Sequence, residues 1–239
     1  MDRQSKSSTS KKAIPESSVA VTSAFVVNTH GDVGVWDDST LLDFGKLGGW
    51  HLKMLTFNTD GTLWGVGLDG NIGVWHGTQW VNLGLLGGWP LKMFVFDLIG
   101  RIWGVHVHGS VGTWNGTSWD DHGPLGGWVL KMISFDAAGR LWGIGMQGNV
   151  GEWNTTSWID RGTLGGWALN ILTFASNGRM WCVGTNGNVG EWTGSSWHNH
   201  GHPIGSSGRW TLSWLAYDKS RKHEHRPPES LGVKYHFNE

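Results

Sequence analysis

The chain has 239 residues, a formal net charge of −1, 39 glycines, 19 tryptophans and a single cysteine, Cys182. This length suits one β domain, and the near-neutral charge argues against binding to nucleic acid or a membrane surface through charge alone. One cysteine excludes an intramolecular disulfide, and no apolar stretch is long enough to span a bilayer.

The N-terminal residues 1–18 are rich in serine and lysine and contain few apolar side chains. Such a composition predicts a disordered polar tail. The segment also lacks the apolar core of a secretory signal. We therefore expect a cytoplasmic protein or one released by a non-classical route.

Tryptophan then recurs at a fixed spacing of 39 residues. Four registers share this period: Trp36, Trp75, Trp114, Trp153 and Trp192; Trp50, Trp89, Trp128 and Trp167; Trp64, Trp103, Trp142 and Trp181; and Trp80, Trp119, Trp158 and Trp197. Trp210 continues the second of these after a four-residue insertion, and Trp214 lies outside all of them. A constant period of this length indicates a repeat architecture.

Each period contains four short apolar runs, at 52–57, 63–67, 71–75 and 80–83 in the first complete unit. Glycine turns such as Asp69-Gly70 separate the runs and supply the positive φ of a tight hairpin. No window has the apolar spacing of an amphipathic helix. Four antiparallel strands per repeat are typical of a β-propeller blade.

Complete units start at Trp50, Trp89, Trp128 and Trp167, whereas the unit at Trp210 retains only a first strand, within 211–217. Residues 24–47 align with the three strands that it lacks. The sequence therefore predicts an all-β, five-bladed propeller over residues 19–217, closed by a composite blade of 211–217 with 24–47. Residues 218–239 are expected to form a polar C-terminal extension, although Leu231–Val233 could instead supply the second strand of the last blade.

The repeated GGW, the LKMLTF-like run and the DGxLWGV run resemble the tachylectin-2-type propeller lectins, and the stretch up to GTxW is similar to the tectonin repeat. The resemblance covers about residues 24–217. It implies a five-bladed propeller with a carbohydrate site near each blade junction. It also implies a preference for N-acetylated amino sugars, of the N-acetylglucosamine or N-acetylgalactosamine type, and a role in innate immunity against microbes.

Sugar binding requires an aromatic ring face and a few polar groups nearby. One position that recurs every 39 residues is always Asp or Asn: Asp43, Asn82, Asp121, Asp160 and Asn199. It lies two residues after the outer tryptophan of each unit, except in the composite blade, where Leu41 replaces the tryptophan. The predicted carbohydrate-binding residues are this Asx ring, the outer tryptophans Trp80, Trp119, Trp158 and Trp197, and the GGW tryptophans Trp50, Trp89, Trp128, Trp167 and Trp210.

Structural roles compete with these assignments. The Asx ring could simply cap turns, and the outer and GGW tryptophans could be packed rather than exposed. We interpret the other two registers, which include Trp64 and Trp75, as core between blades. The recurring lysines Lys53, Lys92 and Lys131 are interpreted as strand-end side chains that extend to solvent.

Nothing in the sequence indicates an enzyme, because no acid–base pair or activated nucleophile breaks the repeat. Cys182 replaces a strand glycine and is interpreted as buried. His198, His200 and His202 could bind a metal, but no carboxylate or cysteine completes a set, so no metal or cofactor is expected. We predict a monomeric, multivalent lectin that binds neither nucleic acid nor membranes. The alternative is a protein-interaction scaffold.

Overall fold

The computed structural model describes residues 23–37, 39–205 and 208–220. The predicted N-terminal tail, residues 1–18, lies outside the described residues, as do residues 221–239 of the C-terminal extension and the alternative strand at Leu231–Val233.

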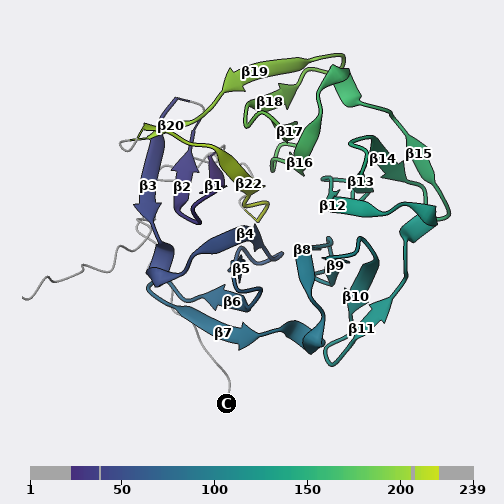
Figure 1. Ribbon diagram of the computed structural model, residues 1–239, viewed down its shortest axis with the longest axis horizontal. Helices are drawn as coiled ribbons and strands as arrows, with labels where there is room; N and C mark the ends of the chain where they lie inside the picture. The colour runs from purple at the N-terminus through teal and green to yellow at the C-terminus, as the bar shows by residue number, and fades with distance from the viewer. Residues whose placement is uncertain (1–22, 38, 206–207, 221–239) are drawn as a thin grey trace, which may run out of the picture.

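Five antiparallel sheets of four strands surround a common centre (Figure 1). The first single-segment blade contains β4 (Leu52–Phe57), β5 (Leu63–Gly67), β6 (Ile72–Trp75) and β7 (Trp80–Gly84), and the second contains β8 (Leu91–Phe96), β9 (Ile102–His106), β10 (Val111–Trp114) and β11 (Trp119–Asp121). The third contains β12 (Leu130–Phe135), β13 (Leu141–Gly145), β14 (Val150–Trp153) and β15 (Trp158–Asp160), and the fourth contains β16 (Leu169–Phe174), β17 (Met180–Gly184), β18 (Val189–Trp192) and β19 (Trp197–Gly201). The predicted five-bladed propeller is confirmed.

The fifth blade joins the two ends of the described chain. Its innermost strand is β22 (Leu212–Tyr217), which pairs antiparallel with β1 (Ala24–Asn28), followed outward by β2 (Val33–Trp36) and β3 (Leu41–Gly45). The register pairs Phe25 with Ala216. The second-strand position next to β22 is therefore filled by β1, and the N-terminal strands close the ring as predicted.

Short connections complete the ring. Four 3₁₀ turns precede β4, β8, β12 and β16, at Leu47–Gly49, Leu86–Gly88, Leu125–Gly127 and Leu164–Gly166. The four-residue insertion forms a small hairpin of β20 (Ile204–Gly205) and β21 (Gly208–Arg209). Within the described ranges, no helix has both the length and the apolar character required to cross a membrane.

One aromatic contact repeats at every boundary between neighbouring blades. The aromatic side chain of the second strand packs against the last residue of the next blade's first strand. The five pairs are Phe25–Phe57, Trp64–Phe96, Trp103–Phe135, Trp142–Phe174 and Trp181–Tyr217, with ring centroids 4.9, 5.5, 5.7, 5.8 and 5.9 Å apart, respectively. The LWG tryptophans are therefore core between blades, as predicted, and the contact extends across the composite blade on both sides.

Removal of residues 1–47 should open the ring, because it deletes β1, β2 and β3 and leaves β22 without a partner inside its own sheet. An unpaired strand recruits other chains. We expect the shortened protein to form oligomers or aggregates in light scattering, and to melt at a lower temperature than the full chain.

Deletion of residues 1–18, which removes none of the described strands, is the control and should leave the protein monomeric. A monomeric 1–47 deletion with an unchanged melting curve would contradict closure by the N-terminal strands.

Candidate functional site

The Leu-Gly-Gly turn that enters each single-segment blade is bound to that blade's outermost strand. In the second blade, the indole Nε1–H of Trp119 donates to the Leu86 carbonyl at 2.8 Å. The same bond joins Trp80 to Leu47, Trp158 to Leu125 and Trp197 to Leu164, at 2.8, 2.7 and 2.7 Å. An indole N–H that leaves water needs an acceptor, and the turn supplies it in all four blades.

The first glycine of the turn makes this bond possible. Gly87 has a φ of +58°, and a Cβ on it would lie 2.5 Å from Cζ3 of Trp114 and 3.1 Å from Cδ1 of Trp119. Only glycine adopts this backbone conformation and also leaves room for the two rings. In the four single-segment blades the third-strand tryptophan thus packs beneath the entry turn of its own blade, which corrects the expectation that this register lies between blades. Trp36 of the composite blade does lie between blades, with its ring centroid 6.0 Å from that of Trp181 in the fourth blade.

The GGW tryptophan covers the same outer tryptophan. Trp89 stacks on Trp119 with centroids 4.9 Å apart and an interplanar angle of 21°. It also covers Gly112 of β10, where a Cβ would lie 2.5 Å from Trp89. Trp50–Trp80 and Trp128–Trp158 repeat the stack, at 5.6 and 5.3 Å.

The fourth blade departs from this pattern. Trp167 and Trp197 are 6.0 Å apart and inclined by 36°. In the other single-segment blades a second-strand glycine lies against the outer tryptophan, for example Gly143 against Trp158, where a Cβ would be 2.8 Å away. Cys182 occupies this position, fully buried, so its side chain takes space that the glycine leaves to the ring. Burial raises the pKa of the thiol above its usual range, as expected for a packed, unreactive cysteine.

The predicted aromatic site residues thus divide into two groups. The outer tryptophans are largely covered, with Trp158 and Trp197 only 9% and 8% exposed, and their N–H groups are already bonded. Trp210 packs over Gly34 in the composite blade and is 3% exposed. The four GGW tryptophans Trp50, Trp89, Trp128 and Trp167 are partly exposed. Trp80 and Trp119 are partly exposed as well, but their N–H groups are bonded to the entry turns.

The Asx ring caps turns, the simpler of the two roles considered for it. In each blade its Oδ1 accepts a hydrogen bond from the backbone N–H of the glycine two residues later, at 2.7–2.8 Å; the pairs are Asp43–Gly45, Asn82–Gly84, Asp121–Gly123, Asp160–Gly162 and Asn199–Gly201. This is an Asx turn. It explains why every member is Asp or Asn without requiring a ligand.

Polar groups of a different turn lie beside the GGW tryptophan. The turn between the second and third strands is hydrogen-bonded to the residue that follows this tryptophan. In the fourth blade, Thr185 N–H donates to the Ala168 carbonyl at 2.8 Å. A hollow of about 180 Å³ lies between Trp167 and this turn, lined also by Gly166, Gly184 and Asn186. The residues at the Asn186 position in the other blades are His30, Asp69, His108 and Gln147. They share the spacing of 39, but the sequence at this turn predicts only a hairpin.

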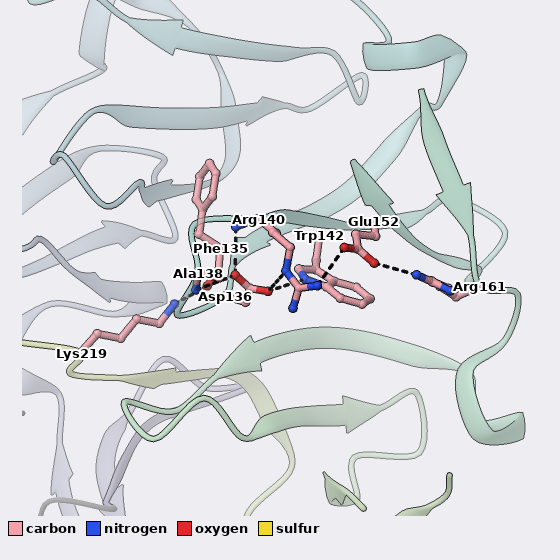
Figure 2. Close-up of polar contacts among 8 residues, drawn as sticks. All are labelled: Phe135, Asp136, Ala138, Arg140, Trp142, Glu152, Arg161 and Lys219. Atoms are coloured by element: carbon pink, nitrogen blue, oxygen red, sulfur yellow. Dashed lines mark hydrogen bonds and ion pairs between the residues drawn. The ribbon is translucent and has the colours of Figure 1, made fainter. Parts of the chain in front are cut away.

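The largest charged cluster is structural. Asp136 Oδ2 accepts from Arg140 Nε at 2.7 Å and from Trp142 Nε1 at 3.2 Å, and Glu152 lies between Arg140 and Arg161 (Figure 2). Burial raises the pKa of Asp136, but its hydrogen bonds from Arg140 and Trp142 outweigh burial and hold the pKa below the usual range. A carboxylate held ionised in this way anchors Trp142 and is poorly suited to proton transfer.

Only two of the three histidines of the fourth blade lie together: the rings of His198 and His200 are 4.7 Å apart. His200 packs on Trp181 with centroids 4.9 Å apart, and His202 Nδ1 is 3.2 Å from the Trp210 carbonyl. Among the described residues, no group of three or more His, Cys, Asp or Glu side chains is placed to hold a metal ion.

Known proteins resemble this chain in fold and not in sequence. No protein-family model and no curated protein matches it. A solved structure described as "The de novo evolutionary emergence of a symmetrical protein is shaped by folding constraints" superposes with a TM-score of 0.58 at 21% identity, over 81% of this chain and 97% of that chain. YCF48 bound to D1 peptide gives a TM-score of 0.48 at 14% identity, over 75% of this chain and 79% of that chain. The first likeness supports the propeller fold alone, and membership of the tachylectin-2 type stays a prediction.

Two adjacent glycines allow the packing of the entry turn to be tested. Gly126 and Gly127 have φ values of +56° and +79°, but a Cβ on Gly126 would lie 2.5 Å from Trp153 whereas one on Gly127 meets nothing within 4 Å. Both alanine variants strain the backbone by about 1–2 kcal/mol. Gly126→Ala should lose a further ~1–3 kcal/mol because it overpacks the tryptophans.

Chemical denaturation of both variants measures the difference directly. Equal stabilities would show that the turn is not packed on Trp153.

Proposed function

We propose that the protein is a multivalent, non-catalytic lectin, in which a GGW tryptophan and the turn between the second and third strands of the same blade form each sugar site. The observation that carries this proposal is the hollow between Trp167 and Asn186. It combines a partly exposed indole with a side-chain amide and backbone groups, which are the components that sugar recognition uses.

The resemblance to tachylectin-2-type lectins supports N-acetylated amino sugars as the ligand class. Repetition around the ring supports multivalency, because several weak sites on one rigid body gain avidity without new contacts. The sites are not identical, since His106 lies against Trp89 with centroids 5.2 Å apart and occupies space that is open beside Trp167. We therefore propose fewer functional sites than blades.

A protein-interaction scaffold is the second candidate, favoured by one observation. The same turns carry exposed apolar side chains, with Leu68, Val107 and Met146 59%, 45% and 56% exposed. Exposed apolar residues gathered on one face mark protein contacts more often than sugar sites. A glycan array that shows no binding, together with a protein partner whose binding weakens in the Met146→Ser variant, would favour the scaffold.

The lectin proposal predicts opposite outcomes for two asparagines of the fourth blade. Asn186 lines the hollow and its Oδ1 caps the turn by accepting from Asn188 N–H at 3.0 Å. Asn177 caps the preceding hairpin, at the other end of the strands, by accepting from Arg179 N–H at 3.0 Å. Asn186→Ala should weaken its own site by about 1–3 kcal/mol through a lost hydrogen bond to the sugar, whereas Asn177→Ala loses a similar cap and no ligand contact.

Calorimetric titration with N-acetylglucosamine oligomers, preceded by a glycan array with free N-acetylglucosamine as competitor, gives the stoichiometry. We expect Asn186→Ala to remove one site and Asn177→Ala none. The site assignment would be wrong if both variants bind like the parent chain, and the lectin proposal fails if the parent chain binds no glycan.

A further inference from the structure

A cavity of about 500 Å³ opens on the axis of the propeller, where the first strands of the blades begin. Its lining comes from the starts of β8, β12, β16 and β22 and from the adjacent turns, and includes Lys92, Lys131, Asn170 and Trp214. Figure 1 shows these first strands converging on the centre. The volume is that of a metabolite site rather than a single water.

The second residues of the five first strands form a ring about the propeller axis, and four of them, Lys92, Lys131, Asn170 and Ser213, line this cavity. In three consecutive blades this residue is a lysine, Lys53, Lys92 or Lys131, and in the other two it is Asn170 or Ser213. The three lysines are half-buried, as expected for strand-end side chains whose stems are covered. No lining residue of the cavity is acidic, and none of the three lysines forms an ion pair with a residue in the described part of the chain.

The positive charges of the three lysines repel one another. Burial lowers the pKa of all three, and the charge of Lys92 further lowers the pKa of Lys53 and Lys131. Lys53 Nζ donates to the Leu91 carbonyl at 2.8 Å, while Lys92 Nζ has a sulfur acceptor, Met146 Sδ, at 3.6 Å. Clustered, partly desolvated cations without anionic partners are costly unless an anion joins them.

The remaining lining completes a binding site with two chemically different sides. Thr29, Thr185 and Thr211 bring hydroxyl groups, and Met93, Met132 and Trp214 bring apolar surface. Trp214, the tryptophan outside the repeat, lies in the position that Met54, Met93 and Met132 occupy in other blades. Trp214 and Met132 also line the cavity at the opposite end of the axis, so these two side chains lie between the two cavities.

We propose that this axial cavity binds a small organic polyanion, with its phosphate or carboxylate groups against Lys92 and Lys131 and its uncharged part against Trp214. Lysine is a point-charge ligand that suits either kind of anion. The site lies on the propeller axis and shares the turn residues Gly184 and Thr185 with the hollow beside Trp167, but none of its charged residues lines that hollow.

The test uses the full chain and two probes, inorganic pyrophosphate and citrate, with sodium chloride at matched ionic strength as the reference. The variant Lys92→Asn/Lys131→Asn places in β8 and β12 the residue that β16 carries at the same position, so the fold should tolerate it. The control Lys46→Asn/Arg209→Asn removes the same charge from exposed positions outside the cavity.

Calorimetry and thermal melting should show binding of at least one probe to the parent chain. Affinity should fall by roughly tenfold or more in Lys92→Asn/Lys131→Asn and stay within about twofold in the control. Without a probe, the cavity variant should melt higher than the control, because it removes repelling charges. Binding of pyrophosphate alone identifies a phosphate ligand, and binding of citrate alone identifies a polycarboxylate.

Two results would overturn the proposal. One is stabilisation by pyrophosphate and citrate no greater than by chloride at the same ionic strength. The other is equal affinity of the cavity variant and the control for the probes. Melting curves of both variants show whether each is folded before the affinities are compared.

Discussion

The hydrogen bond from the outer tryptophan to the Leu-Gly-Gly turn is the interaction on which the ring depends. In the four single-segment blades, it joins the turn that enters the blade to the outermost strand of the same blade. Aromatic contacts between second and first strands then hold neighbouring blades together. Because the four single-segment blades repeat both contacts, stability is distributed around the ring, as in other repeat architectures.

The fold could be predicted from the 39-residue spacing. This period shows which residues form one blade and which N-terminal residues complete the last blade. Position 25 falls one period before Trp64, and Phe25 does pack against Phe57 as Trp64 packs against Phe96. The site was harder to predict. Outer and GGW tryptophans recur with the same period, and only the structure shows that one lies beneath the other. The Asx ring is periodic because the turn requires it, so periodicity could not separate a capping role from a binding role.

Residues that break the repeat mark where the blades differ. Cys182 loosens one tryptophan stack, His106 fills the space beside Trp89, and Trp214 divides the axial space. The change from lysine to Asn170 and Ser213 gives the axial ring a charged side and a neutral side. A symmetric scaffold thus carries asymmetric surfaces, since the packing contacts restrict only the residues that make them.

The hydrogen bond between the outer tryptophan and the entry turn is tested most directly by hydrogen exchange of the indole N–H groups, followed by NMR after transfer to deuterated water. The packing predicts slow exchange for Trp80, Trp119, Trp158 and Trp197, whose N–H groups are bonded to the turn carbonyls. The four GGW tryptophans, partly exposed in the same blades, should exchange much faster. Equal rates for the two sets, in a protein that remains folded throughout, would show that the entry turns are not held by the outer tryptophans.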